Sequence, residues 1–149
     1  MVDGANAAAA VKSVIAAEDA RVWQVWMAQP PNLPDVLTTF SAAAAKTSTI
    51  NLGTSIVPTY PRHLPVMAQQ ALALHDLASG RLRLGIGPSH LFIIDNMYGL
   101  QHSKRLTHLR EYSEVLLTVL WTGKVNHRGH FYNVEITMPR TAQIPLFQY

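Results

Sequence analysis

Short apolar runs of strand-forming residues alternate with helical segments along most of this sequence. Three such runs lie at Val22–Ala28, Thr49–Val57 and Arg81–Ile86, and each follows a segment with helical composition or spacing. When strands alternate with helices, each helix returns the chain to the same end of the sheet, so the strands pair in parallel through right-handed crossovers. The alternation therefore predicts an α/β fold built on a parallel sheet.

The segments around these runs supply the rest of the expected elements. Four helices are expected, at Ala5–Ala20, Val36–Ala45, Arg62–Ala78 and Ser103–Trp121. Asp35 is placed to cap the second helix, and Gly80 and Gly123 stand where the third and fourth should end. The remaining residues predict a long connection over Gly87–Gln101, a hairpin over Val125–Val134 that turns at Arg128–Gly129, and a further strand beginning at Pro145–Phe147.

Length and composition limit how much of a larger fold the sequence can hold. We expect one domain over residues 1–149, because domains usually take about 100–200 residues. A complete eight-unit β/α barrel needs about 250 residues. Hydrophobic residues make up 48% of the chain, enough for a packed core, whereas charged residues make up only 14%. An ordinary soluble domain carries about 25% charged residues, so part of the surface is expected to be covered by another molecule.

Charge and cysteine content argue against several classes of function. The formal net charge is +3 without a run of basic residues, so no nucleic-acid partner is expected. The absence of cysteine excludes disulfides and thiolate chemistry and fits a reducing, cytoplasmic location. The opening MVDGANAAAAVK is not typical of a signal peptide, and no long apolar stretch suggests membrane insertion. Histidine spacing and the scattered carboxylates predict no metal site.

Small polar groups follow each of the three expected strands. The three strand ends are Ala28–Pro30, Thr54–Pro58 and Gly85–His90. Each one alone is compatible with an ordinary loop. In a parallel α/β fold, however, the carboxyl ends of the strands share one side of the sheet, and ligands bind there. Taken together, the three segments predict a ligand pocket at that end.

The third strand end offers specific groups for such a ligand. Gly85 and Gly87 would allow a close approach of the backbone and leave amide N–H groups free for an anion. The pattern is not the dinucleotide-binding fingerprint, because His90 stands where the third glycine should be. His63 and His90 are both expected at the ligand end, where either could move a proton. The other five histidines are expected at the surface: His75, His102, His108, His127 and His130.

At these strand ends the sequence resembles the bacterial-luciferase-like superfamily, and specifically its coenzyme F420-dependent oxidoreductases. The segments that carry the resemblance are INLGTSIVPTYPRH (Ile50–His63), AQQALALHDLASGRLRLGIGPSH (Ala68–His90), MYGL (Met97–Leu100) and HLREYSEVL (His108–Leu116). With the AAEDA helix and the VWMAQ strand, it extends over about residues 16–131. A Ser-Gly-Arg-Leu-x-Leu-Gly-x-Gly run preceded by Leu-Gly-Thr and a proline loop is a specific combination.

The resemblance implies a luciferase-like (β/α)8 TIM barrel that binds a deazaflavin or flavin at the carboxyl ends of its strands. It implies a non-prolyl cis peptide bond at Ser55–Ile56, behind the deazaflavin ring. It further implies hydride transfer between coenzyme F420 and an unknown organic substrate, with the protein supplying orientation and electrostatics. It places Gln29 near the substrate and makes Gly85–His90 a cofactor-contacting loop. We therefore predict Gln29 and His90, the latter as a proton carrier, as catalytic residues, and Ser55, Ile56, Gly85, Gly87, Pro88 and Ser89 as cofactor-binding residues. The alternative for His90 is that it only caps the loop or lies in solvent.

Compared with such a family, the sequence predicts a partial barrel. We expect it to lack the first strand and the C-terminal half, and to retain strands two to four and the start of the fifth. Three functions stay open. The chain is an F420-dependent oxidoreductase whose missing half comes from a second copy, as a homodimer, or from a complementing chain. Alternatively, it is a non-catalytic truncated fragment or assembly piece, or it is an FMN-dependent monooxygenase subunit.

Overall fold

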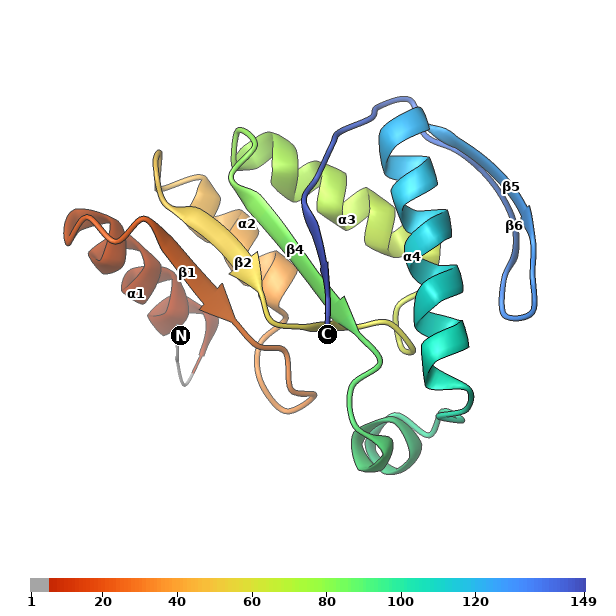
Figure 1. Cartoon of the computed structure of the whole chain (residues 1–149). Helices are drawn as coiled ribbons and strands as arrows, with labels where there is room; N and C mark the ends of the chain where they lie inside the picture. Colours follow the sequence, from red (N-terminus) through yellow and green to blue (C-terminus); the bar gives the residue numbers. More distant parts are fainter. Residues whose placement is uncertain (1–5) are drawn as a thin grey trace.

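The computed structural model of the chain describes residues 6–149 and contains a parallel sheet with helices packed along one face (Figure 1). Its helices are α1 (Ala7–Asp19), α2 (Val36–Ala44), α3 (Leu64–Leu77), a short π-helix (Ile93–Met97) and α4 (Arg105–Thr122). Its strands are β1 (Gln24–Met27), β2 (Asn51–Thr54), β3 (Val57–Pro58), β4 (Leu82–Gly87), β5 (Lys124–Arg128), β6 (Asn133–Thr137) and β7 (Leu146–Gln148). The expected start of the first helix at Ala5 lies outside the described residues.

The main sheet is parallel throughout, as the alternation of elements predicts. β1 pairs with β2, β2 with β4, and β4 also pairs with β3 and β7. Ile86 of β4 lies opposite both Val57 and Gln148, so β3 and β7 occupy opposite edges of β4. The parallel pairing confirms the α/β class, and β7 forms where Pro145–Phe147 predicts a strand.

β2 and β3 are two parts of one strand that is interrupted at Ser55–Ile56. Leu52 lies opposite Leu82, and Val57 lies opposite Ile86. The interrupted strand thus advances from 52 to 57, five positions, while its partner advances from 82 to 86, four positions. The extra residue makes this point a bulge, a device that bends a strand and redirects side chains next to binding sites. The Ser55–Ile56 bond is cis, as the resemblance implies.

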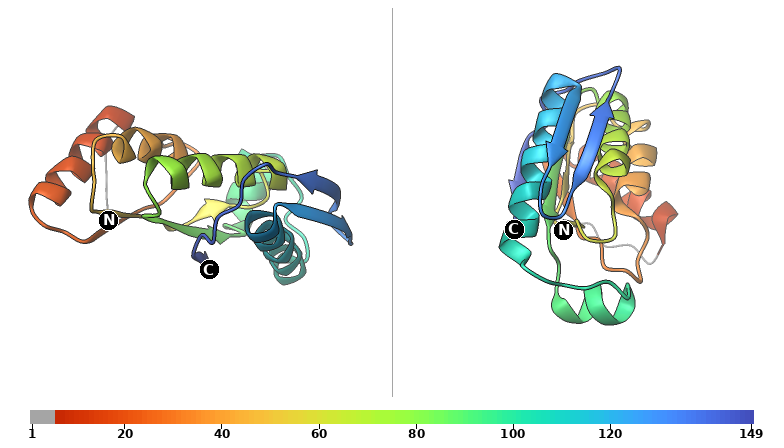
Figure 2. Two further views of the ribbon diagram at one scale, coloured as in Figure 1. Left: turned by 90° about the horizontal axis from the view of Figure 1, so that it is seen from above. Right: turned by 90° about the vertical axis from the view of Figure 1, so that its right-hand side faces the viewer.

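Helices α1, α2, α3 and α4 lie side by side in chain order, and the first three cover one face of the sheet (Figures 1 and 2). Local sequence explains where they begin and end. Asn6 accepts a hydrogen bond from the Ala9 N–H at the start of α1, and Asp35 does the same for Thr38 in α2. Gly123 ends α4 with a positive φ of 75°, which glycine adopts without steric cost. The core lies between helices and sheet, around Phe40, Leu84 and other buried residues.

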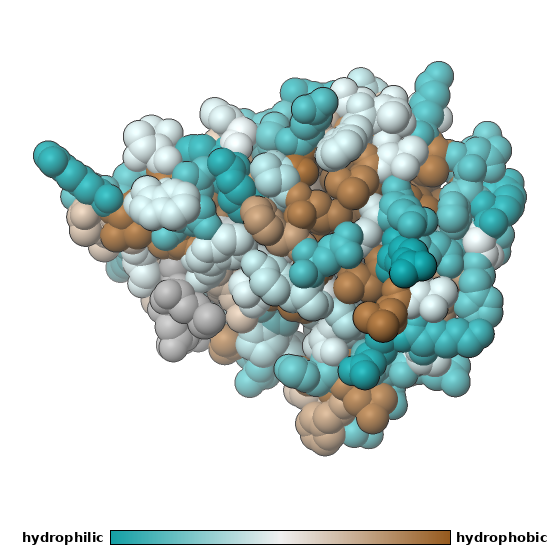
Figure 3. All heavy atoms as spheres, viewed as in Figure 1, coloured by the Kyte–Doolittle hydropathy of each residue, from teal (hydrophilic) through white to brown (hydrophobic). Residues whose placement is uncertain are grey.

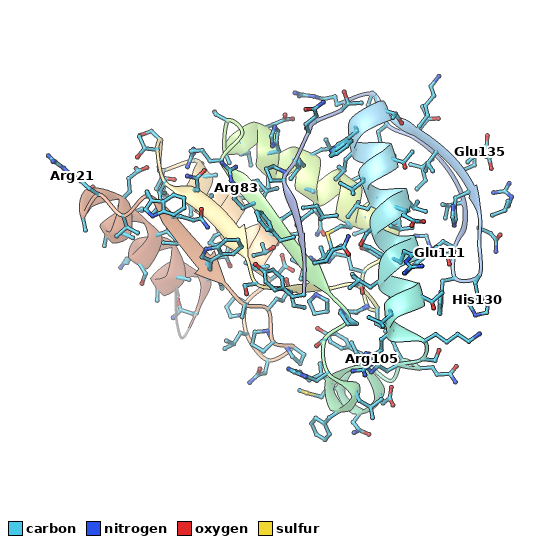
Figure 4. All side chains as sticks on the ribbon, viewed as in Figure 1. Arg21, Arg83, Arg105, Glu111, His130 and Glu135 are labelled. Atoms are coloured by element: carbon cyan, nitrogen blue, oxygen red, sulfur yellow. The ribbon has the colours of Figure 1, made fainter. Side chains whose placement is uncertain are left out.

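The opposite face of the sheet carries aromatic and charged side chains rather than helices. Trp26 lies over Gly53, where an added Cβ would come within 2.4 Å of the indole ring. Trp26 and Phe147 meet edge to face with ring centroids 5.8 Å apart. Figure 3 shows hydrophobic side chains in the middle of this face, and Figure 4 places Arg83 there on β4. This face is therefore partly apolar and open to solvent.

The predicted hairpin is present but longer than expected. β5 and β6 pair in antiparallel fashion with Arg128 opposite Asn133, so the connection is Gly129–Tyr132 rather than a turn at Arg128–Gly129. The carboxylate of Glu111 on α4 holds this connection: it accepts hydrogen bonds from the Phe131 and Tyr132 amides at 2.8–3.1 Å. The conformation of this loop therefore depends on Glu111, a side chain distant in sequence. Local turn patterns cannot reveal such a contact.

The expected long connection after β4 is also partly helical, since Ile93–Met97 forms a π-helix. Its flanks expose apolar side chains: Leu91 is 58% exposed and Phe92 is 66% exposed. None of the helices described for residues 6–149 is both long and apolar enough to cross a membrane.

Candidate functional site

The three predicted strand ends meet in one cleft at the carboxyl side of the sheet. The cleft has a volume of about 210 Å³ and is lined by Ala28, Gln29, Pro30, Ser55, Ile56, Ser89, His90 and Ile93. The first three follow β1, the next two form the bulge between β2 and β3, and the last three follow β4. The structure thus brings together five predicted site residues: Gln29, Ser55, Ile56, Ser89 and His90.

Gln29 is fixed by the helix that follows it. Its side-chain oxygen accepts a hydrogen bond from the Val36 N–H, the first amide of α2, at 3.4 Å. The same helix start is capped by Asp35, which also pairs with Arg62 from the loop after β3. Burial favours the neutral carboxyl of Asp35, but the Thr38 amide and the Arg62 guanidinium outweigh it and hold the pKa of Asp35 below its ordinary value. One wall of the cleft is therefore anchored by polar contacts.

The bulge forms the base of the cleft. Ser55 donates its backbone N–H to the Met27 carbonyl at 2.9 Å, which continues the pairing with β1 beyond the end of β2. The next residue, Ile56, presents an apolar side chain between the ends of β1 and β4. The interrupted strand thereby supplies both a hydroxyl and an apolar surface at the same point.

The two glycines of the third strand end have a different role from the expected one. The amide of Gly85 donates to the Thr54 hydroxyl at 2.8 Å, and its carbonyl accepts from the same hydroxyl at 2.8 Å. An added Cβ at Gly85 would lie 2.0 Å from the Thr54 carbonyl oxygen. The expectation that Gly85 leaves its amide free for an anion is therefore wrong: strand packing requires this glycine.

Gly87 and Pro88 likewise lie outside the lining of the cleft. An added Cβ at Gly87 would come within 2.6 Å of the carbonyl of Tyr149, so the residue after β7 occupies the space that the missing side chain leaves. Ser89 follows with a positive φ of 64° and turns the chain so that Ser89 and His90 both line the cleft. The ligand-facing part of this loop is its end rather than its glycines.

Histidines outside the cleft correct a second expectation. His108 was expected at the surface, yet it is only 3% exposed, on the inner side of α4. Its ring stacks on Tyr60 with centroids 3.9 Å apart, and its Nε2 lies 2.8 Å from the Tyr132 hydroxyl. Burial lowers the pKa of His108 to about 4, so the ring is neutral at pH 7. His63, the other histidine expected at the ligand end, packs its ring edge-on against Tyr132.

Acidic and imidazole groups do not converge elsewhere in a way that suits a metal ion. Among residues 6–149, no group of three or more histidines, cysteines or acids lies close enough to ligate one. Among the residues that the structure describes, those lining the strand-end cleft include a single imidazole and no carboxylate. Its chemistry is that of hydrogen bonding and proton movement beside an apolar surface.

A family model supplies the decisive comparison, because it matches nearly the whole chain. The model for "Luciferase-like monooxygenase" matches residues 2–148. The chain belongs to the luciferase-like monooxygenase family.

The solved structures that are similar to this chain are named with different cofactors. The chain is 32% identical over 105 residues to the 5,10-methylenetetrahydromethanopterin reductase of Methanolobus tindarius, covering 70% of this chain and 32% of the relative. The solved coenzyme F420-dependent tetrahydromethanopterin reductase of Methanopyrus kandleri matches with a TM-score of 0.80 and 25% identity, over 93% of this chain and 46% of that one. The oxygenating constituent of 3,6-diketocamphane monooxygenase from Pseudomonas putida, solved with FMN, shares the fold at 19% identity and a TM-score of 0.76, over 85% and 37% of the two chains.

This member of the luciferase-like family thus spans about a third of the length of its curated relatives and less than half of these solved structures. The printed names of the two solved structures include coenzyme F420, a deazaflavin, for one and FMN, a flavin, for the other.

Proposed function

We propose that this luciferase-like protein is an oxidoreductase that transfers a hydride between coenzyme F420 and an organic substrate, with the deazaflavin held in the strand-end cleft. The observation that carries the proposal is the convergence of Gln29, Ser55 and His90, from three strand ends, in one cleft. The solved reductase that is named for coenzyme F420 supplies the cofactor class.

The cleft fits one edge of a flat ring system. Ile56 and Pro30 offer apolar surface, while Gln29 and Ser89 offer hydrogen-bonding groups at its margin. Its volume of about 210 Å³ is below the roughly 300–1,000 Å³ of sites that enclose a whole ligand. The rest of the cofactor would therefore extend beyond these residues.

Each lining residue has a role in this proposal. Ile56 supports the ring from behind, Ser55 lines the base beside it, and the Ser89 hydroxyl donates to a ring oxygen. Gln29 orients the substrate from the β1 side. Bound F420 would supply hydride chemistry at its C5 carbon. For a substrate carbon that gains a hydride, His90 donates the balancing proton to the neighbouring substrate atom, and in the opposite direction it accepts that proton.

The exposed face of the sheet suggests how such a site is completed. Trp26 and Phe147 cover only part of this face, and Leu106 on α4 is 83% exposed. Apolar surface of this kind is typical of protein interfaces. We expect a second copy of the chain, or a complementing half-barrel, to cover it. If a second copy covers this face, sedimentation velocity should show a concentration-dependent dimer. A monomer at all concentrations would exclude the second copy and leave the complementing half-barrel.

Titration with F420, followed by the absorbance of the deazaflavin, tests the cofactor assignment. We expect saturable binding that Ser55→Trp weakens by at least about tenfold, because the indole would fill the base of the cleft. Ser13→Trp, on the exposed side of α1, is the matched control and should bind F420 like the wild type. Circular dichroism of both variants should match the wild type.

The same titration separates the alternatives. Tighter binding of FMN than of F420 would favour a flavin-dependent monooxygenase subunit, as in the relative solved with FMN. If neither F420 nor FMN bound saturably, to the monomer or to a dimer, the proposed function would be overturned. The remaining interpretation would be a non-catalytic piece.

A further inference from the structure

A second cleft lies beside α4 and shares no residue with the strand-end cleft. Its volume is about 260 Å³, and it is lined by Tyr60, Leu100, Gln101, Ser103, His108, Phe131 and Tyr132. These residues come from four separate segments: the loop after β3, the end of the connection after β4, α4, and the β5–β6 loop. We call it the α4 cleft. All its walls belong to this chain.

The walls of the α4 cleft are held in place by specific contacts. The Tyr60 hydroxyl donates to the Ser103 carbonyl at 2.6 Å, which fixes the loop before α4. Tyr60 and His108 stack with an interplanar angle of 11°, and Phe131 meets His108 edge-on at 5.1 Å. Glu111 fixes Phe131 and Tyr132 through their backbone amides. The cleft is therefore preformed, like most small-molecule sites.

His108, one of the residues that line the cleft, has a polar atom without a partner. Its Nε2 is paired with the Tyr132 hydroxyl, whereas its Nδ1 is buried and has no hydrogen-bond partner among residues 6–149. His102, packed edge-on against Tyr60, leaves both ring nitrogens buried and unpaired within the same residues. A buried polar atom without a partner carries an energetic cost for the folded protein. A ligand that supplies the missing hydrogen bond would recover that cost.

The lining indicates the chemistry of that ligand. Within the described residues, no Asp, Glu, Lys or Arg lines the α4 cleft. Of the charged groups around it, Glu111 contacts the β5–β6 loop and His127, Lys104 contacts His130, and Arg62 pairs with Asp35. Asp95 accepts a hydrogen bond from the His102 amide, and Asp95 and Arg105 both lie close enough to Tyr60 to act on its pKa. Figure 4 shows Glu111 on the side of α4 that faces the loop carrying His130. Three aromatic rings and a neutral imidazole remain to make contact.

From this arrangement we infer that the α4 cleft is a binding site for a small uncharged ring compound that carries a hydroxyl or ring nitrogen. The ring packs against Phe131 and Tyr132, and its polar atom pairs with the unused nitrogen of His108. Gln101 and Ser103 offer further hydrogen bonds at the rim. The inference concerns a site separate from the proposed cofactor cleft and stands whether or not the chain binds F420.

A fluorinated phenol tests the inference directly. Titration of the wild-type chain into 4-fluorophenol, followed by ¹⁹F NMR, should show saturable binding. His108→Phe keeps a ring that can stack on Tyr60 and removes both nitrogens, and it should weaken binding by at least about fivefold. His75→Phe, on α3 and outside the α4 cleft, is the matched control and should leave the affinity unchanged.

A measurement on the wild type covers the case in which His108→Phe does not fold. Addition of 4-fluorophenol should shift the imidazole ¹⁵N resonances of His108 and leave those of His75 in place. Non-saturating titration, equal affinity of His108→Phe and the wild type, or an unmoved His108 resonance would each overturn the site. Tighter binding of 4-fluorobenzoate than of 4-fluorophenol would overturn the assignment of an uncharged ligand.

Discussion

The two ends of the parallel sheet use their polar side chains differently. At the amino end, the Glu18 carboxylate accepts hydrogen bonds from the backbone N–H groups of residues 48–50 at 2.6–3.2 Å. Arg81 donates there to the carbonyls of Ala44, Thr47 and Ile50. Buried nitrogens without a partner among residues 6–149 occur at both ends: Arg81 Nε at the amino end, and His102 and His108 at the carboxyl end, where His108 lines a cleft.

We expect the amino end to maintain the fold and the carboxyl end, where both clefts lie, to bind ligands. A charged side chain that satisfies several backbone groups stabilises only the protein itself. A polar atom left over at a cleft gains its partner when a ligand arrives. The division is typical of parallel α/β folds, in which sites lie at the carboxyl ends of strands. Changes at the amino end should therefore alter stability, and changes at the carboxyl end should alter binding.

The largest effect is expected for Arg81→Met. The substitution keeps an unbranched apolar stem but leaves the carbonyls of Thr47 and Ile50 without their donor in a half-buried loop. We expect the free energy of unfolding to fall by about 3 kcal/mol, the order of two hydrogen bonds to a charged group. Urea denaturation followed by circular dichroism measures it.

Arg83→Met is the matched control, since Arg83 contacts only nearby carbonyls, including Gly80, from the open face of the sheet. It should cost less than about 1 kcal/mol. Equal losses for the two variants would remove the distinction between the covered and open faces at this end.

A smaller loss is expected for Glu18→Gln, because one charged acceptor is replaced by a neutral one. Desolvation favours the neutral carboxyl of Glu18, but the backbone N–H groups of Thr49 and Ile50 outweigh it and lower its pKa to about 2. We expect a loss of about 1–2 kcal/mol at pH 7. A lowered carboxyl pKa stabilises the fold above pH 4.5, and that contribution disappears as the pH falls towards 2.

Asp19→Asn, at the adjacent position, is the control for the loss of a charge. It should leave both the unfolding free energy and its acid dependence close to wild type. If Glu18→Gln retained the wild-type decline in stability between pH 4.5 and 2, the carboxylate would not be the source of that decline.

The sequence predicts the sheet and the strand-end cleft because both follow from local order. Apolar runs mark β1, β2 and β4, and parallel pairing then places Gln29, Ser55 and His90 at one end without any side-chain detail. The bulge at Ser55 and Ile56 lies at the same end of the sheet, where the interrupted strand has one residue more than its partner. These features need only the chain's alternation and its punctuation by proline and glycine.

The α4 cleft could not be predicted, because its contacts join residues far apart in sequence. His108 lies on a helix whose spacing gives no sign that this position faces Tyr60 and Tyr132. The role of Glu111 depends on a loop some twenty residues later. Gly85 was misinterpreted for the same reason: its partner, the Thr54 hydroxyl, belongs to a neighbouring strand.

A pH experiment sharpens the comparison at the carboxyl end. Burial lowers the pKa of His108 from 6.5 to about 4, so the unfolded chain binds a proton in this range that the folded chain does not. The free energy of unfolding should therefore decrease as the pH falls from 6.5 to 4. His108→Phe should show a shallower decrease than wild type in urea titrations at pH 7, 6 and 5. Parallel pH profiles for the two proteins would contradict the burial of a neutral imidazole.

The smallest effect on stability is expected for His90→Ala, because His90 is exposed and follows β4 rather than packing in the core. The free energy of unfolding should change by less than about 0.5 kcal/mol, as for most surface substitutions. If His90 balances hydride transfer with a proton, turnover with F420 should fall by about 10²–10⁴-fold while F420 affinity stays the same. His90→Gln keeps a hydrogen-bonding side chain but cannot carry the proton, so it should lose turnover equally. If both variants lost F420 affinity, His90 would instead have a positioning role. If His90→Ala lowered the free energy of unfolding by more than about 1 kcal/mol, His90 would maintain the fold, as the amino-end residues do.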